Sequence, residues 1–463
     1  SAMKIRKKLG LFDFTMIVVS LVIGMGIFRT PVNVAKASYS PFLFFSIWVV
    51  GGLVALCGAL TYAEIGSRLP VTGGYYKIFS YAYHPSIAFG VNCLILVSNA
   101  ASLAGVALVG GEYITGIFLP LSKNIVWLQS SANKLYLQTI HITIALVAII
   151  LFYGVNLLGL KMSAKTQNVL TVVKIILILL LITPLLLSEA GPSLLPAIHD
   201  QKQVLMTEYL KAFGTGLVAV SFTYGGYQQT INFGAEVDKP KKNIPSGIFL
   251  GIAIIITLYL VINYAYVKVI GFEQLKNSQN IAAIMAGKVF GINAERVLSV
   301  FLFLSVLAYV NVLLMSNPRV MAAMSEDNIL PVSFGRRHVK TEVLSTSLSV
   351  FAAVCAIIVF WAKEFDTILS FSIFLDSFGM ILSAGSIFML RKKTAHLNDS
   401  GIFIMKLYPL LPIIFIMAYT FVAVNLLITE TKLSLIGIGV LTAFIAIYFI
   451  MQKFKKQATY ERA

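Results

Sequence analysis

The sequence SLVIGMGIFRTP, at residues 20–31, places two glycines inside the first long apolar segment of the chain. The sequence FTYGGYQ, at residues 222–228, places two more inside the sixth such segment. Each glycine weakens a helix by about 1 kcal/mol relative to alanine, so a close pair favours local unwinding. The simpler alternative is that these glycines only let neighbouring helices pack closely, as small residues in membranes often do.

The composition identifies the surroundings of both stretches as a lipid bilayer. Of the 463 residues, 58% are hydrophobic and only 12% are charged, whereas soluble domains contain roughly 25% charged residues. The mean hydropathy of +0.87 is too high for the cores of soluble domains, which stop growing at roughly 250–300 residues. These values exclude a soluble enzyme and predict a protein that crosses a membrane many times.

Twelve segments are long and apolar enough to cross a bilayer, which takes about 20 residues. They lie near residues 13–34, 41–63, 86–110, 139–160, 167–188, 209–234, 246–268, 296–316, 345–362, 367–390, 405–428 and 433–453. We therefore predict an all-α integral membrane protein with twelve transmembrane helices. Because this number is even, both ends of the chain are expected on the same side of the membrane.

The basic residues predict which side that is. A net charge of +17 could suggest a nucleic-acid partner, but such binding needs Lys and Arg gathered on one surface. Here they stand in short loops, mostly on the N-terminal side, as in residues 4–8, 239–242 and 391–393. Under the positive-inside rule both termini are cytoplasmic. We expect a multi-pass protein of the cell membrane that binds no nucleic acid.

The two glycine-containing stretches lie in the first and the sixth predicted spans, five spans apart. Interruptions at corresponding places in two halves of a membrane protein indicate a transport site between inverted repeats. Unwound backbone at membrane depth is tolerated only where it is buried in protein or lines a water-filled cavity. The matched positions therefore favour a binding site at the breaks over simple helix packing.

Three stretches carry further information. They are IGMGIF at 23–28 with Pro31, YAEIGSRLPVTGGYY at 62–76, and FTYGGY at 222–227 followed by EVDKPKKNIP at 236–245. Together, and in this order, they resemble the amino acid–polyamine–organocation transporter family, most of all its L-type amino acid transporter branch. With the predicted spans in register, the resemblance covers essentially the whole chain.

The resemblance implies a leucine-transporter-like fold, in which the first ten spans form two inverted repeats. Residues 13–188 would be the first repeat and 209–390 the second, with the last two spans, 405–453, outside both. The tails, residues 1–12 and 454–463, would be cytoplasmic. The resemblance also implies transport of amino acids by alternating access, in which spans 1, 2, 6 and 7 move against the other spans.

The resemblance further implies that the breaks bind the substrate through backbone groups. The N–H groups around Met25 and Gly26 would hold the α-carboxylate of an amino acid, because the N-terminus of a half-helix favours an anion. The carbonyls of Val22, Phe222 and Gly225 would hold its α-amino group, and the ring of Phe222 would act as a gate over the substrate. The full predicted set is Val22, Ile23, Gly24, Met25, Gly26, Phe222, Thr223, Tyr224, Gly225 and Gln228.

Two residues depart from the family pattern. Met25 stands where the family's Gly-Ser-Gly motif has serine, and Gln228 stands where L-type relatives often carry asparagine. Methionine removes a hydroxyl and adds a bulky, flexible side chain. We therefore expect a smaller or more apolar pocket.

Lys174 lies near the middle of the fifth span, where a lysine costs about 2.5–3.5 kcal/mol and usually faces a pathway or a partner. It resembles the lysine that, in proton-linked and exchanging relatives, replaces a sodium ion between spans 1 and 8. We expect Lys174 to act in coupling, with Ser305 of span 8 as its hydrogen-bond partner. Its ammonium is either a proton carrier, since desolvation favours the neutral form, or a fixed positive charge. Both alternatives disfavour sodium coupling.

Two other charged residues are expected to form a gate. Arg29 follows the first break on its outer side, and Asp376 lies well inside the tenth span. In sodium-dependent proteins of the same fold, an arginine and an aspartate at similar places close the outer vestibule. We therefore predict an Arg29–Asp376 pair. The alternative is that Asp376 caps a local bend or pairs elsewhere.

These features predict a secondary active transporter and not an enzyme. The sequence has no nucleotide-binding motif and no set of residues at membrane depth that forms a nucleophile with its base or a metal site, so no cofactor or metal is expected. We expect neutral L-amino acids as substrates, because no anionic side chain stands beside the breaks in the sequence. Polyamines or cationic amino acids are the alternative, and a non-transporting sensor is another. Exchange, proton symport and uniport stay open.

The three cysteines lie in apolar segments and show no metal-binding or disulfide pattern; they are Cys57, Cys93 and Cys355. In animal L-type transporters a cysteine between spans 3 and 4 forms a disulfide with a glycoprotein heavy chain. Residues 111–138 contain no cysteine, so we expect no disulfide-linked partner.

Overall fold

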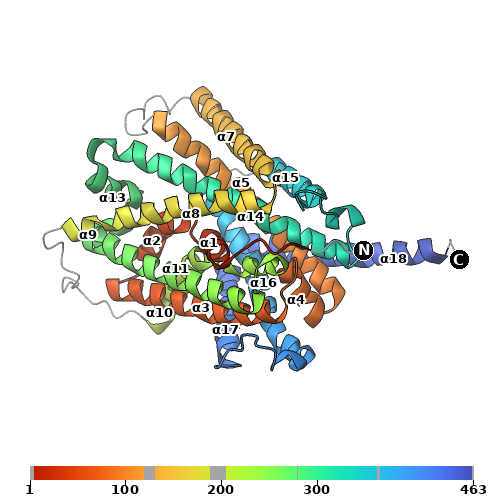
Figure 1. Ribbon diagram of the computed structural model, residues 1–463. Helices are drawn as coiled ribbons and strands as arrows, with labels where there is room; N and C mark the ends of the chain where they lie inside the picture. Colours follow the sequence, from red (N-terminus) through yellow and green to blue (C-terminus); the bar gives the residue numbers. More distant parts are fainter. Residues whose placement is uncertain (1–4, 119–130, 188–204, 279, 362–364, 461–463) are drawn as a thin grey trace.

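The computed structural model describes residues 5–118, 131–187, 205–278, 280–361 and 365–460 (Figure 1). These residues are almost entirely helical, and their extended pairings are two isolated bridges, between Leu9 and Val237 and between Thr72 and Phe233. The predicted all-α fold class is confirmed. The boundary between the two expected repeats, residues 188–204, lies outside the described residues, as do the outermost parts of both tails.

A helix occupies each of the twelve predicted spans. In chain order these are α1 (Leu11–Val22) with α2 (Gly26–Ala37), α3 (Pro41–Arg68), α5 (Pro85–Phe118), α7 (Ser131–Leu157), α8 (Leu160–Ile182), α10 (Met206–Tyr224), α11 (Pro240–Ile270), α14 (Ala294–Glu326), α15 (Ser345–Val359), α16 (Phe365–Lys393), α17 (Leu410–Thr429) and α18 (Thr431–Tyr460). Shorter helices are α4 (Gly74–Ala82), α9 (Pro184–Leu187), α12 (Phe272–Asn277) and α13 (Ile281–Phe290). The 3₁₀ helices are η2 (Tyr227–Asn232), η3 (Gly234–Glu236), η4 (Gly291–Asn293), η5 (Val332–Gly335) and η6 (Ala395–Leu397).

By length and hydropathy, nine helices in the described parts of the chain are able to cross a membrane. The number rises to ten if α1 and α2, which are bent by 42° at their break, form one span. Helix α10 and the 15-residue helix α15 are not among these ten. A membrane protein with many apolar helices is therefore established, whereas the number of twelve crossings and the inverted repeat stay predictions.

Helix α1 lies in the middle of the helical bundle (Figure 1). Nine consecutive residues, from Phe14 to Val22, are buried, and α1 packs against α8, α11 and α14. A helix that is apolar on all sides is stable when other parts of the protein surround it. Helix α18 is the opposite case, because large apolar side chains such as Leu435, Ile447 and Phe454 are exposed on it and would face lipid in a membrane.

One end of the bundle, here called the N-side, carries the start of α1, the ends of α3 and α16, and the loop between α10 and α11. There the N–H of Leu9 donates to the carbonyl of Glu236 at 3.0 Å, and Arg68 donates to the hydroxyl of Thr394 at 3.2 Å. Halfway along the bundle, α2 packs against α10. This contact brings the first and the second helix break together.

Candidate functional site

Within the part of the chain that the structure describes, the first break leaves three backbone N–H groups without a partner at the start of a helix. Helix α1 ends at Val22 and α2 begins at Gly26. Among the described residues, the N–H groups of Gly24, Met25 and Gly26 donate no hydrogen bond. Because the N-terminus of a helix carries a partial positive charge, these donors favour an anionic group such as a carboxylate.

The second break lies directly against the first because two glycines leave room for it. Gly226 has a φ of +118°, and a Cβ atom at this position would collide with the carbonyl oxygen of Leu21. A Cβ atom on Gly26 would lie only 2.9 Å from Thr223 Oγ1. The hydroxyls of Thr223 and Thr30 share a hydrogen bond of 2.6 Å. The two unwound stretches therefore touch each other and form one structural unit.

A cavity lies between the breaks and four neighbouring helices. Its lining includes most of the predicted binding residues, namely Val22, Gly24, Met25, Gly26, Phe222, Thr223, Gly225 and Gln228. The other walls come from α5, α14, α16 and α17 and carry Asn99, Ser102, Tyr309, Asp376 and Tyr419. The structure thus brings two stretches about 200 residues apart in the chain around a single space.

Two predicted binding residues do not line this cavity. Ile23 is fully buried, and its carbonyl accepts a hydrogen bond from Lys174. The ring of Tyr224 packs against Trp48 and Tyr259, with ring centroids 6.0 Å and 5.1 Å away. Ile23 and Tyr224 therefore lie behind the lining of this cavity, and their role in substrate binding stays a prediction.

Lys174 of α8 binds the end of α1. Its side chain is fully buried. Its Nζ donates to the carbonyl of Ile23 at 2.6 Å and to that of Ser20 at 3.5 Å. Carbonyls at the C-terminal end of a helix lack helical donors and favour a cation. Lys174 therefore places its side-chain nitrogen directly beside the first break, where a coupling residue was expected.

The side chains of Lys174 and Ser305 do not form the expected hydrogen bond in the described structure. Helix α8 is instead joined to α1 and α14 through Gln167. The Ser305 hydroxyl donates to a carbonyl of its own helix at 3.0 Å. Two turns before Lys174, Gln167 donates to Ser20 of α1 and to a carbonyl of α14, and accepts from Asn311 at 2.7 Å. Helices α1, α8 and α14 are thus joined through Gln167, because the amide both donates and accepts.

Arg29 and Asp376 also do not form the predicted pair in the described structure. Arg29 forms a salt bridge with Glu112 of α5, with a separation of 3.6 Å, and the two side chains are 38% and 51% exposed. Asp376 accepts a hydrogen bond of 3.0 Å from Ser98, also on α5. Each charge has a nearer partner on α5, and Asp376 lines the cavity. No anionic side chain stands beside the breaks in the sequence, but the fold brings that of Asp376 to the space between them.

Sequence reasoning missed several polar residues of the cavity. Asn99, Gln229, Tyr309 and Tyr419 come from four different elements, α5, η2, α14 and α17. The available signal is that each is a polar side chain in or beside an apolar span. Their shared location depends on packing between elements that lie far apart in the chain, so it could not be read from local sequence.

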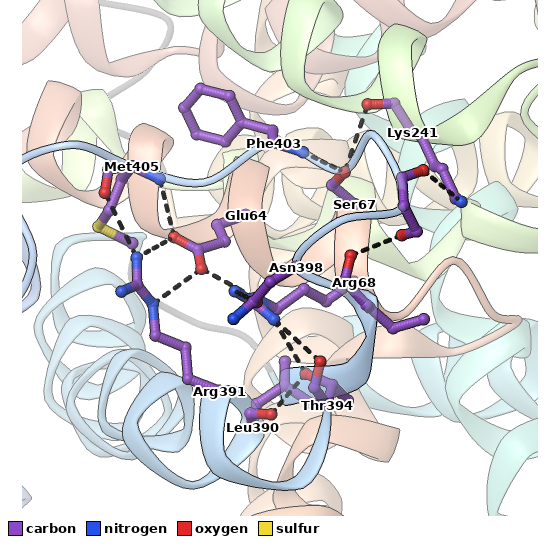
Figure 2. A network of polar contacts seen from close by, with 12 residues as sticks. Glu64, Ser67, Arg68, Lys241, Leu390, Arg391, Thr394, Asn398, Phe403 and Met405 are labelled. Atoms are coloured by element: carbon purple, nitrogen blue, oxygen red, sulfur yellow. Dashed lines mark hydrogen bonds and ion pairs between the residues drawn. The ribbon is translucent and has the colours of Figure 1, made fainter.

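On the N-side, a buried carboxylate joins α3 to α16 (Figure 2). Glu64 is fully buried and accepts hydrogen bonds of 2.8 Å from both Arg391 and Arg68. The N–H of Met405 adds a hydrogen bond of 2.9 Å. Arg68 continues the network to Thr394 and Asn398. A carboxylate is tolerated here because opposite charges and hydrogen bonds compensate for its burial.

A second buried carboxylate on the N-side joins the loop after α10 to α14. Glu236 accepts hydrogen bonds from Arg319 at 2.6 Å and from Arg337 at 2.9 Å. Burial alone raises the pKa of the Glu236 carboxyl, but the two guanidinium groups outweigh burial and hold the pKa below its ordinary value of 4.5. The Glu64 and Glu236 clusters thus join segments that lie far apart in the chain on the N-side of the bundle.

The sequence matches known membrane transporters over nearly its whole length. The family model for Amino acid permease matches residues 9–451. The serine/threonine exchanger SteT of Bacillus subtilis is 25% identical, over 97% of this chain and 98% of the relative. The large neutral amino acids transporter small subunit 2 of Homo sapiens is 25% identical, over 96% of this chain and 80% of the relative. The cystine/glutamate transporter of Homo sapiens is 26% identical, over 85% and 76%.

These relatives are transporters and not enzymes, and they include proteins of the L-type branch that the sequence motifs indicated. The family match spans both helix breaks, the cavity between them and the two N-side clusters. The chain therefore belongs to the amino acid permease family of the amino acid–polyamine–organocation superfamily and is a membrane transporter of amino acids.

Proposed function

We propose that this transporter exchanges small and medium-sized neutral L-amino acids across the cell membrane by alternating access. The observation that carries the proposal is that two interrupted spans line one cavity, and that the N–H groups of Gly24, Met25 and Gly26 have no partner in the described part of the chain. Every amino acid has an α-carboxylate and an α-amino group, which backbone groups recognise whatever the side chain. The serine/threonine exchanger and the large neutral amino acids transporter among the relatives support exchange of neutral substrates.

In this proposal the α-carboxylate binds the N–H groups at the start of α2, and the α-amino group binds carbonyls at the ends of α1 and α10. The carbonyl of Gly225 accepts no hydrogen bond among the described residues. That of Val22 accepts one from Tyr259 at 3.2 Å, and that of Phe222 accepts one from the N–H of Gly225 at 3.3 Å. Each carbonyl has two lone pairs, so all three can accept from an ammonium. The ring of Phe222 closes over the substrate.

We propose that Lys174 replaces a coupling ion. Its ammonium is fully buried and bonded to two carbonyls of α1, so it holds this helix end in the way that a bound cation would. A positive charge that belongs to the protein makes sodium unnecessary. In an exchanger the charge stays fixed, whereas in a proton symporter it would be lost and regained in each cycle.

We propose that the N-side faces the cytoplasm, which places both termini there. The concentration of Lys and Arg in the N-side loops supports this orientation. The buried Glu64 and Glu236 clusters then close the cytoplasmic side in this conformation, and Arg29 with Glu112 forms a weaker, half-exposed contact on the outer side. The protein would act without a disulfide-linked heavy chain, because residues 111–138 contain no cysteine.

The test is uptake of labelled alanine, serine and leucine into proteoliposomes, with and without unlabelled amino acid inside. We expect internal amino acid to accelerate uptake, and neither a sodium gradient nor a proton gradient to change it. Uptake into empty vesicles that depends on an inward proton gradient would replace exchange by symport. Saturable binding without any uptake would make the protein a sensor, and uptake of polyamines alone would overturn the neutral substrate class.

A further inference from the structure

Three side-chain amides next to the cavity form a row of hydrogen bonds. One backbone carbonyl at its end determines which atom of each amide donates and which accepts. Asn317 Nδ2 donates to the carbonyl of Leu313 at 2.9 Å, so Asn317 Oδ1 is the atom that accepts from Asn99 Nδ2, at 2.7 Å. Asn99 Oδ1 in turn accepts from Gln229 Nε2 at 3.3 Å. Because a carbonyl can only accept, the direction of every bond in this chain follows from Leu313.

The chain ends on an acceptor that has no donor. The side chain of Gln229 lines the cavity and is 6% exposed. Its Nε2 is used, and its Oε1 has no hydrogen-bond partner among the described residues. A buried amide oxygen without a donor is unfavourable. Oε1 has almost no accessible surface in this conformation, so a rotation of the Gln229 side chain is needed to expose it to the cavity. A ligand that then brings a donor would gain binding energy, and a ligand without one would not.

A second acceptor lines the same cavity. Asp376 accepts one hydrogen bond, from Ser98 at 3.0 Å, and no salt bridge among the described residues involves it. The side chains of Tyr309 and Tyr419 line the same cavity. A carboxylate inside a membrane protein without a basic partner favours a ligand that supplies donors or positive charge.

We propose that Gln229 Oε1 and the Asp376 carboxylate form a side-chain subsite that selects amino acids whose side chain donates hydrogen bonds. The donor is a hydroxyl within the proposed neutral class, or an ammonium, which would extend that class to small cationic amino acids. The proposal rests on the proposed function, which places the α-carboxylate and the α-amino group at the two breaks. The free backbone groups there recognise what all amino acids share, and these two acceptors distinguish one amino acid from another. An apolar side chain in the same place would leave Gln229 Oε1 unpaired and would bring Asp376 no donor beyond Ser98.

The test uses three amino acids with side chains of equal length and size. Norvaline, homoserine and 2,4-diaminobutyrate differ only in the last group of the side chain, which is a methyl, a hydroxyl or an ammonium. Each competes with labelled substrate for exchange in proteoliposomes, and 2-aminobutyrate, serine and 2,3-diaminopropionate provide the same comparison one carbon shorter. We expect the wild-type protein to prefer at least one donor-bearing member over the methyl member by about tenfold or more.

Three variants test whether Gln229 Oε1 and the Asp376 carboxylate produce the preference for donor-bearing side chains. Gln229→Leu removes the free acceptor and should bring the ratio of homoserine to norvaline close to one. Asp376→Asn keeps the shape and removes the charge, so it should reduce the preference for diaminobutyrate more than that for homoserine. Asn92→Leu is the matched control, because Asn92 Oδ1 is also a buried oxygen without a partner but lies outside the cavity lining. It should leave every ratio unchanged. Ratios within one preparation do not depend on how much of a variant is folded.

The possible outcomes separate the two proposals. If norvaline competes as well as both donor-bearing members, the subsite does not exist, while the proposed amino acid exchange stands. If Asn92→Leu changes the ratios as much as Gln229→Leu, the preference does not come from the cavity, and the proposal fails. If no α-amino acid of either length exchanges, the proposed function itself is wrong.

Discussion

The ammonium nitrogen of Lys174 lies 2.6 Å from the carbonyl oxygen of Ile23, one residue beyond the end of α1. The contact connects the fifth span directly to the break in the first span, on the side that faces away from the cavity. A movement of α1 relative to α8 would stretch or break this hydrogen bond. Lys174 is therefore placed to connect the state of the substrate site with the position of the helix that carries it.

Replacing Lys174 by methionine should slow exchange by at least about tenfold. Methionine has a similar length but no donor, so two buried carbonyls of α1 would lose their partner, at about 1–3 kcal/mol for each group. The measurement is the initial rate of exchange, normalised to the amount of folded protein. Lys165→Met is the control, because Lys165 lies on the same helix and is exposed. Equal rates in the two variants would contradict the role given to Lys174.

Alanine at Gly226 should abolish substrate binding. Its Cβ would meet the carbonyl oxygen of Leu21, and a φ of +118° is unfavourable for any residue with a side chain. The two breaks would have to move apart, which displaces the groups proposed to bind the substrate. Gly439→Ala, at a position in α18 with open space around it, should leave exchange intact. Substrate binding that survives in Gly226→Ala would show that the contact between the breaks is not required.

Loss of the Glu64 carboxylate should destabilise the protein strongly. Glu64→Gln leaves Arg391 and Arg68 beside a neutral group in a buried site, and breaking a buried pair typically costs about 3–5 kcal/mol. We expect a clearly lower melting temperature in detergent. Glu273→Gln removes a carboxylate that is 80% exposed, and it should have almost no effect. A double-mutant cycle with Arg391→Met should show a large coupling energy, and simple additivity would argue against a direct interaction.

Acid should weaken the N-side through Glu236. Because the folded state lowers the pKa of this carboxyl below its ordinary value of 4.5, Glu236 stabilises the fold at all pH values above that value. This contribution is lost as the pH falls through the lowered pKa of the folded state. Melting temperatures measured from about pH 6 down to about pH 3 should therefore fall less steeply for Glu236→Gln than for the wild type. The variant should also be less stable at neutral pH. Parallel curves would mean that other carboxyls dominate the acid response.

Much of the molecule could be predicted from local sequence. Apolar segments of sufficient length predicted a helix at every span, and the glycines predicted both breaks, at Gly24–Gly26 and Gly225–Gly226. These are properties of short stretches, since burial in lipid depends on hydropathy and unwinding depends on the residues at the break. Eight of the ten binding residues that the family resemblance implied line the cavity.

The partners of the charged and polar side chains were decided by the tertiary structure alone. Arg29 pairs with Glu112, and Asp376 lines the cavity. The side-chain nitrogen of Lys174 donates to the carbonyl of Ile23 at the end of α1 and not to Ser305. A charge inside a membrane protein takes whichever partner the packing of helices brings nearest, and that partner comes from a span far away in the chain. The sequence determined that this protein crosses the membrane and breaks two of its helices there. Only helix packing determined which polar atoms in the space between them lack a hydrogen-bond partner, because those partners come from helices that are far apart in the sequence.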